Sequence, residues 1–146
     1  DRVLPTPSLT PADARTAARM DQVMPINDWY LFQGVGNVIG FQRVVGPRLM
    51  GLTPDEVVIE AAMPRAHTVF EELSRLLGER SWLAGDQLSL ADLLVAPQVD
   101  FFAGMPEWEQ LTAGRANLAA WLDRMNARPS MAATTWEQVA AMAQAA

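Results

Sequence analysis

The chain contains no cysteine and no lysine, and it has one histidine and one tyrosine among its 146 residues. Without cysteine it can form no disulfide bond, no thiolate metal site and no cysteine nucleophile. No apolar run approaches the roughly 18 residues that a membrane-spanning helix needs. The first residues also show no signal-peptide pattern. The composition fits a reducing compartment, and we expect a cytoplasmic location.

The charge of the chain is unbalanced, with a formal net charge of −6. All of its basic residues are arginines, and they form no clustered stripe. An acidic chain of this kind argues against binding to nucleic acid or to an anionic membrane surface. Half of the residues are apolar, which is enough to bury the core of one domain at this length.

The first half of the chain predicts a linker followed by one long helical region. Residues 1–9 contain Pro5 and Pro7 without hydrophobic periodicity, as in an extended linker. Thr10-Pro11-Ala12-Asp13 is a capping-box pattern with proline at the first helical position. We expect its helix to be kinked or interrupted at Pro25, to continue over 26–45, and to end at Gly46-Pro47.

A second helix is predicted from Thr53-Pro54-Asp55-Glu56, which repeats the capping-box pattern with proline. Apolar residues at spacings of three and four continue to Leu77, as in an amphipathic helix. Pro64 lies inside this helix and should bend it. Gly78 is placed to cap its C-terminal end.

The stretch 82–97, WLAGDQLSLADLLVAP, carries the strongest local signal. Ser89 and Asp92 form a capping box. In it the Ser89 hydroxyl oxygen accepts a hydrogen bond from the N–H of Asp92, and the Asp92 carboxylate accepts one from the N–H of Ser89. Leu88 and Leu93 occupy the two positions of a hydrophobic staple. The helix that follows is apolar almost all round, so we expect it to be the buried centre of the protein.

The C-terminal part predicts two further helices. Leu118, Trp121, Leu122 and Met125 form an apolar stripe that ends before Pro129, and Thr135 starts a short last helix. No stretch shows the alternation of a strand. The sequence therefore predicts an all-α bundle of about five to six helices around the central helix that starts near Ser89.

Residues that could perform chemistry are few. His67 has no partner at metal-ligand spacing, which favours a structural role over catalysis or metal binding. The remaining acidic candidates are expected to be solvated helix charges: Glu71, Glu72, Glu107 and Glu109. The sequence predicts no catalytic residue and no metal site in this chain.

Gly34, Gly36 and Gly40 are spaced as Gly-x-Gly-x-x-x-Gly. A dinucleotide-binding loop requires a strand before the glycines and a helix after them, and no strand is predicted here. We expect Gly36 and Gly40, four residues apart, to let another helix approach closely.

Several stretches together resemble one family. WLAGDQLSLADLLVAP is similar to the start of the buried central helix in the C-terminal domain of glutathione S-transferases. Residues 119–130 resemble its penultimate helix and exit turn, and 18–22 and 44–47 resemble its first helical region in bacterial members. The resemblance implies that 1–9 is an interdomain linker remnant and 10–146 the helical domain. It also implies an N-terminal thioredoxin-like domain that is absent from this chain.

In that family the N-terminal domain holds most of the glutathione site and the residue that activates the thiol. The resemblance leaves to this domain one wall of the pocket for a small apolar electrophile, with candidates on the first long helix: Met20, Met24, Asn27 and Tyr30. Met20 and Met24, four apart, equally fit ordinary core positions. A buried Tyr30 would need a partner for its hydroxyl, and the mouth of a pocket provides one.

The resemblance further implies a homodimer, with glutathione as co-substrate and no bound cofactor. Asp21 and Asp28 are both open as contacts to glutathione of a partner subunit, and Trp29 and Phe32 could serve the pocket or the dimer. Alone, this chain is expected to be inactive. Two alternatives remain, a non-enzymatic protein-interaction module on the same fold and the effector half of a transcriptional regulator. The capping-box stretch disfavours the second.

Overall fold

The computed structural model describes residue 3 and residues 6–145, and every regular element in that part of the chain is helical. In chain order the elements are α1 (Ala14–Pro25), η1 (Ile26–Val45), α2 (Gly46–Met50), α3 (Glu56–Leu77), α4 (Leu90–Ala103), α5 (Trp108–Thr112), α6 (Ala116–Asn126), α7 (Pro129–Ala133) and α8 (Trp136–Ala145). The elements α2, α5 and α7 are single turns, and α1 runs directly into η1. The longer units are therefore α1 with η1, α3, α4, α6 and α8, and the predicted all-α bundle is confirmed.

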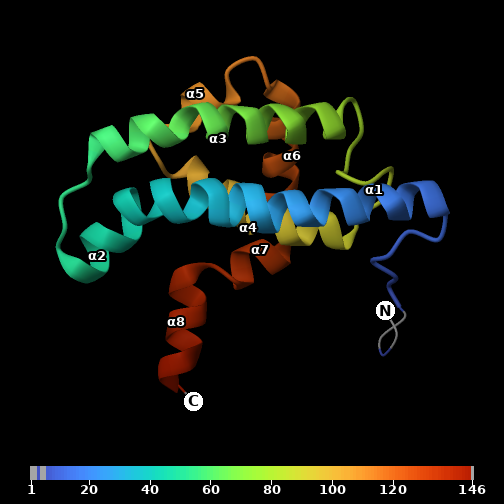
Figure 1. The fold of residues 1–146 in the computed structure, drawn as a ribbon. Helices are drawn as coiled ribbons and strands as arrows, with labels where there is room; N and C mark the ends of the chain where they lie inside the picture. Colours follow the sequence, from blue (N-terminus) through green and yellow to red (C-terminus); the bar gives the residue numbers. More distant parts are fainter. Residues whose placement is uncertain (1–2, 4–5, 146) are drawn as a thin grey trace.

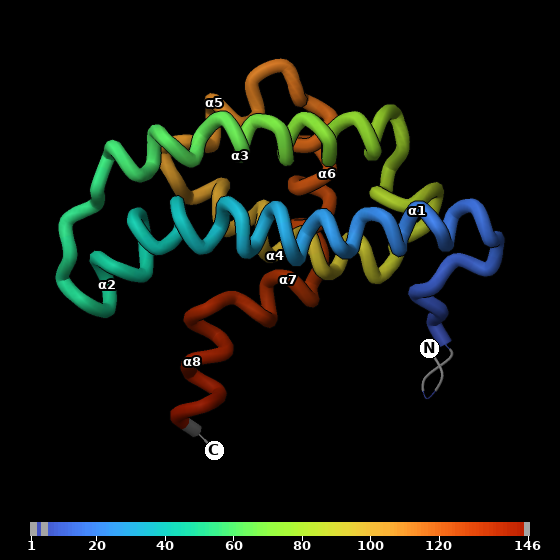
Figure 2. Tube along the Cα trace, viewed as in Figure 1, coloured from blue at the N-terminus to red at the C-terminus, as the bar shows by residue number. Residues whose placement is uncertain are grey.

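The long unit formed by α1 and η1 organises the bundle. It runs alongside α3, and α4 passes behind it in the view of Figure 1 and packs against both α1 and η1. The helix α6 contacts both α3 and α4 and closes the core between them. Figure 2 shows the N-terminal segment and α8 leaving the bundle on the same side.

The predicted linker is described in part. Residues 6–9 form no helix, while residues 1–2, 4 and Pro5 lie outside the described part of the chain. The carbonyl of Leu9 accepts a hydrogen bond of 3.1 Å from the N–H of Leu90. This bond holds the segment against the first turn of α4.

Two helix starts differ from the prediction. The N-terminal cap of α1 is Asp13 and not Thr10, and that of α3 is Asp55 and not Thr53. Each carboxylate accepts from two backbone N–H groups, those of Arg15 and Thr16 in α1 and those of Val57 and Val58 in α3. A charged oxygen is the stronger acceptor for the free N–H groups and also complements the helix dipole, which favours aspartate over threonine as the cap.

Pro25 changes the helix without ending it. The backbone stays right-handed and helical at Pro25 and Ile26, and from Ile26 the hydrogen bonding follows the wider π-helical pattern. Proline has no N–H to donate to the preceding turn, so the regular pattern cannot continue through it. The predicted helix end at Gly46-Pro47 is wrong, because Gly46 is helical and α2 continues to Met50. The chain turns at Gly51, whose φ of +66° favours glycine.

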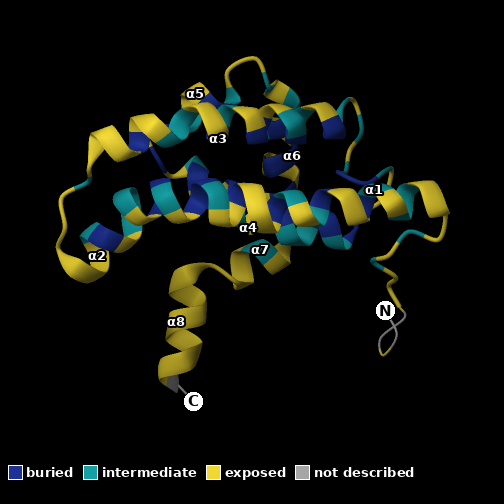
Figure 3. Ribbon diagram, viewed as in Figure 1, coloured by how far each residue is buried: buried dark blue, intermediate teal, exposed yellow. Residues whose placement is uncertain are grey.

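The predicted caps of α3 and α8 are confirmed. Gly78 caps the C-terminal end of α3 through an N–H bond of 2.9 Å to the carbonyl of Ser74, whereas the bend expected at Pro64 inside this helix stays a prediction. The hydroxyl of Thr135 accepts from the N–H of Gln138 at the start of α8. Figure 3 shows α8 exposed along its length, whereas the buried residues gather where α1, η1, α3, α4 and α6 meet.

The central helix α4 is buried on one face only. Ala91, Val95, Val99 and Phe102 are fully enclosed, whereas Phe101 is 36% exposed. The helix is thus the predicted buried centre of the bundle, and its apolar character extends to a side that the described chain leaves partly open. On the less buried side Leu90 and Leu94 are half-buried and Pro97 is exposed.

The close helix approach expected at the glycines is found at Gly40. A Cβ placed there would lie 2.5 Å from Cε1 of Phe101, so the ring of Phe101 on α4 rests against the bare backbone of η1. At Gly36 the nearest atom outside η1 is Oε1 of Gln98 at 3.9 Å, so this glycine makes no comparable approach. No strand precedes Gly34 in the described chain, which leaves no context for a nucleotide loop.

An arginine clamp joins three helices at one end of the bundle. Arg43 of η1 binds both carboxylate oxygens of Glu56 at 2.6 and 2.8 Å, and its Nε donates to Glu107 at 2.8 Å. These bonds raise the pKa of Arg43, those to Glu56 most, and Arg43 lowers the pKa of Glu56. The bond to Glu56 therefore contributes to the stability of the fold at neutral pH. This contribution is lost as the pH falls through the lowered pKa of Glu56.

We predict that Arg43→Met destabilises the protein by about 3 kcal/mol, because it leaves the carboxylate of Glu107 buried without its charged partner. Arg75→Met is the matched control. It breaks an exposed pair with Glu72 and should cost less than about 1 kcal/mol. Urea unfolding of both variants measures the difference, and equal losses would contradict the role of the clamp.

Candidate functional site

Three of the four predicted pocket residues share the inward face of the long helical unit. Met20 and Asn27 are 5% and 3% exposed, and Met24 is half-buried against the core. The amide nitrogen of Asn27 donates to Oδ1 of Asp28 at 3.0 Å. Oδ1 of Asn27 is buried and has no hydrogen-bond partner among the described residues. An unpaired buried acceptor is costly in a folded protein.

Tyr30, the fourth candidate, lies apart from them. Its side chain is 58% exposed, and its place at a pocket mouth stays a prediction. The neighbouring aromatic residues Trp29 and Phe32 are also open, at 65% and 43%. Asp21 and Asp28 are exposed as well. The outer surface of this unit is therefore rich in uncovered aromatic rings.

The predicted capping box is formed, and it is part of a larger group. Ser89 and Asp92 are both fully buried. Oδ2 of Asp92 accepts from the N–H and from the hydroxyl of Ser89, each at 3.0 Å. Oδ1 accepts from the N–H of Leu83 at 2.8 Å and from the indole N–H of Trp121 at 2.9 Å. Four donors and no acceptor meet one carboxylate, which matches the acceptor-only oxygens of its ionised form.

The bonds to Leu83 and Trp121 could not be found from the sequence. Leu83 precedes Asp92 by nine residues in a loop, and Trp121 follows it by 29. The apolar stripe of α6 predicts that Trp121 is buried, and a buried indole N–H needs an acceptor. The stripe alone does not say which acceptor it finds.

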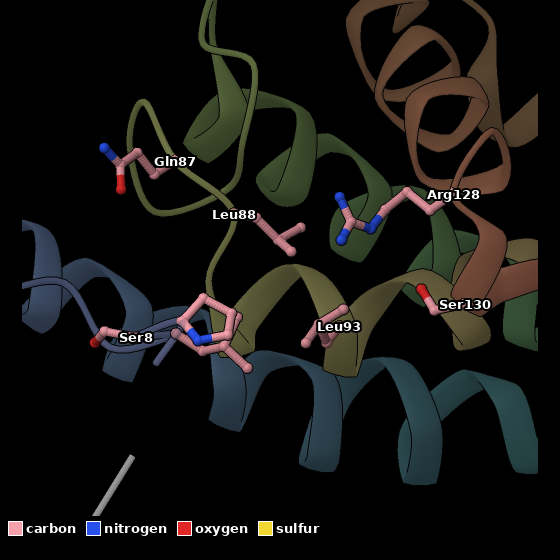
Figure 4. Close-up of a pocket in the computed structure, with 8 residues that line it drawn as sticks. Ser8, Gln87, Leu88, Leu93, Arg128 and Ser130 are labelled. Atoms are coloured by element: carbon pink, nitrogen blue, oxygen red, sulfur yellow. The ribbon is translucent and has the colours of Figure 1, made fainter. Parts of the chain in front are cut away.

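A cavity of about 550 Å³ opens beside the staple (Figure 4). Its lining comes from the N-terminal segment, the loop before α4, α4 itself and the region of α7: Pro7, Ser8, Leu9, Gln87, Leu88, Leu93, Arg128 and Ser130. Leu88 points toward the guanidinium of Arg128, and Gln87 points away. Its size lies within the roughly 300–1,000 Å³ of ligand pockets. None of the four predicted pocket residues lines it.

The other residues considered for chemistry have structural surroundings. His67 is half-buried, and the described chain holds no group of three or more His, Asp or Glu side chains placed to bind a metal. Glu107 corrects the prediction of a solvated charge, because it is 5% exposed and bound by Arg43. Glu72 pairs with Arg75, which lowers the pKa of Glu72.

Comparison with known proteins identifies the family. The family model "Glutathione S-transferase, C-terminal domain" matches residues 17–129, which is well over half of the chain. The chain belongs to this family.

Relatives of known name agree with this assignment. Glutathione S-transferase F7 of Arabidopsis thaliana is 31% identical over 99 residues, which cover 68% of this chain and 46% of that protein. Glutathione S-transferase 3 of Zea mays is 28% identical over 126 residues, covering 86% and 55%. A solved glutathione S-transferase from Rhodospirillum rubrum F11 superposes with a TM-score of 0.73 at 26% identity, over 88% of this chain and 57% of that one.

The chain thus spans about half the length of the curated relatives it matches. The family model and the matched structure show that residues 17–129 form the C-terminal helical domain of the transferase fold. None of the helices in residues 6–145 combines the length and the apolar character needed to cross a membrane.

We predict that Asp92→Asn destabilises the domain by about 3 kcal/mol, because the amide group turns an N–H toward donors that would then be left unpaired. Asp100→Asn on the same helix is the matched control. Asp100 is exposed and only accepts from Asn126, so its amide should cost less than about 0.5 kcal/mol. Thermal unfolding of both variants measures this, and a tolerated Asp92→Asn would show that the carboxylate is dispensable.

Proposed function

We propose that the protein carrying this domain is a glutathione transferase. The thiolate of glutathione attacks a small apolar electrophile held against the wall formed by α1 and η1. The observation that carries this proposal is the match of residues 17–129 to the transferase C-terminal domain family. On the proposed wall Met24 is only half-buried and so keeps surface for a ligand, and methionine adapts its shape to varied apolar ligands.

In the proposed arrangement a second domain carries out the thiol chemistry. A thioredoxin-like domain preceding the linker 1–9 would bind most of the glutathione and lower the pKa of its thiol. Its docking surface would include the half-covered side of α4 at Leu90, Leu94 and Phe101. Two findings support this arrangement, namely the twofold length of the relatives and the uncovered apolar side of the central helix. The helical domain then contributes shape and contact and no catalytic residue.

We extend the proposal to a homodimer that detoxifies electrophiles in the bacterial cytoplasm. The open aromatic side chains of Trp29 and Phe32 would suit a subunit contact or the pocket mouth near Tyr30. Asp21 and Asp28 are exposed, so either could reach glutathione on a partner subunit.

The test is conjugation of an aromatic electrophile by the full-length protein. Met24→Ser should raise the KM for the electrophile about fivefold, through lost apolar contact, while the KM for glutathione stays unchanged. Met142→Ser is the matched control, since Met142 is 59% exposed on α8 and should leave both constants unchanged.

Two outcomes of this assay would contradict the proposal. An unchanged KM for the electrophile in Met24→Ser would show that the α1–η1 face does not form the wall of the electrophile pocket. Conjugation by the 146-residue chain alone would refute the division between the two domains. A full-length protein that retains no glutathione and co-purifies with a macromolecular partner would instead favour the protein-interaction module.

A further inference from the structure

A second cavity, of about 290 Å³, lies between the start of α1 and the loop 78–89. Three arginines line it, Arg15 and Arg19 from α1 and Arg80 from the loop, together with Thr16, Ala84, Gly85 and Asp86. The chain as a whole is acidic, with a net charge of −6. Three of its eleven basic residues nevertheless lie around this one small cavity, so its surroundings are positive in an acidic chain.

The positive charges of this cavity are not balanced by ion pairs. Elsewhere in the chain Arg43, Arg75 and Arg115 each have a carboxylate within 4.0 Å. Among the described residues no carboxylate lies within that distance of Arg15, Arg19 or Arg80, although Asp86 shares the lining. Like charges held together without a counterion repel each other, and a bound anion would relieve this repulsion.

Arg80 shows this imbalance most clearly. Its Nη2 donates to the backbone carbonyl of Leu76, whereas its Nε is buried and has no partner. Burial lowers the pKa of Arg80, and the nearby charge of Arg19 lowers it further, with Asp86 acting in the opposite direction. A buried N–H of a guanidinium without an acceptor is costly unless a ligand supplies one.

The loop that carries Arg80 is held close to α1. A Cβ placed at Gly85 would lie 2.8 Å from Cγ2 of Thr16, so the loop backbone rests directly on the branched side chain of α1. Glycine permits this approach because it has no side chain. The two parts of the cavity wall therefore meet through a close contact between the loop and α1.

We propose that this cavity binds a phosphate-type dianion, either free or as the phosphoryl group of a small molecule or lipid headgroup. Guanidinium groups bind phosphate oxygens through paired N–H bonds. With Asp86 counted, the three arginines leave a formal charge of +2 around the cavity, which a dianion balances and a single carboxylate does not. The volume is just below the roughly 300 Å³ at which ordinary ligand pockets begin, which suits a compact anion. This site is separate from the α1–η1 face and does not depend on glutathione conjugation.

The test uses the protein in the form that its own cell makes, titrated with inorganic phosphate in a calorimeter against chloride at equal ionic strength. We expect saturable binding of one phosphate. Arg19→Gln should weaken it about tenfold or more, since it removes a charged donor from the site. Arg48→Gln is the matched control, because it changes the net charge equally at an exposed residue of α2 and should leave the affinity unchanged.

A stability measurement separates binding from a structural role. Without phosphate, Arg19→Gln should unfold at the same temperature as the unsubstituted protein or higher, because it relieves repulsion with Arg80. With phosphate, only the unsubstituted protein and Arg48→Gln should gain stability. A loss of stability without phosphate would show that Arg19 supports the fold and would overturn the proposal.

Sedimentation with phosphatidylcholine vesicles, with and without phosphatidic acid, identifies the source of the phosphoryl group. Binding of free phosphate alone assigns the site to a soluble ligand. Binding only to vesicles that contain phosphatidic acid assigns it to a lipid headgroup. Failure to bind either, or equal binding by Arg19→Gln, would overturn the proposal.

Discussion

The fold depends on the carboxylate of Asp92, which collects four hydrogen bonds from three parts of the chain inside the core. Ser89 ties it to the start of α4, Leu83 to the preceding loop and Trp121 to α6. Because both Asp92 and Trp121 are fully enclosed, water cannot replace a lost partner, and each bond is worth more than its exposed counterpart. The group fixes the direction in which the central helix enters the bundle, and with it the positions of α1 and η1.

The sequence was informative wherever the signal is local. The spacing of Ser89 and Asp92 predicted the start of the central helix, and the apolar stripes predicted an all-α bundle of the transferase C-terminal type. Contacts between residues far apart in the sequence could not be predicted. Glu107, the buried partner of Arg43, is 64 residues away from it, and no local pattern distinguishes that buried glutamate from a solvated one. Threonine followed by proline misplaced two helix starts, because a nearby aspartate is the better cap.

In the candidate site, too, only part of the arrangement could be predicted from the sequence. The resemblance named Met20, Met24, Asn27 and Tyr30 as pocket candidates. The structure buries the first three at least in part and leaves Tyr30 exposed, and their role in a pocket stays a prediction. In the wider turns of η1 after Pro25, the spacing of a regular α-helix no longer gives the direction of a side chain. The described chain combines a rigid buried centre with apolar and charged surfaces that have no partner within it.

The most direct test of the account is native-state hydrogen exchange at the backbone amide of Leu83. This residue lies in a loop outside every helix, and its N–H donates to the carboxylate of Asp92. If the Asp92 group holds the core together, the amide should exchange only on global unfolding, as slowly as the most protected amides of α4. Exchange at the rate of an open loop would contradict the account, because it would show that the bond to Asp92 breaks without disturbing the fold.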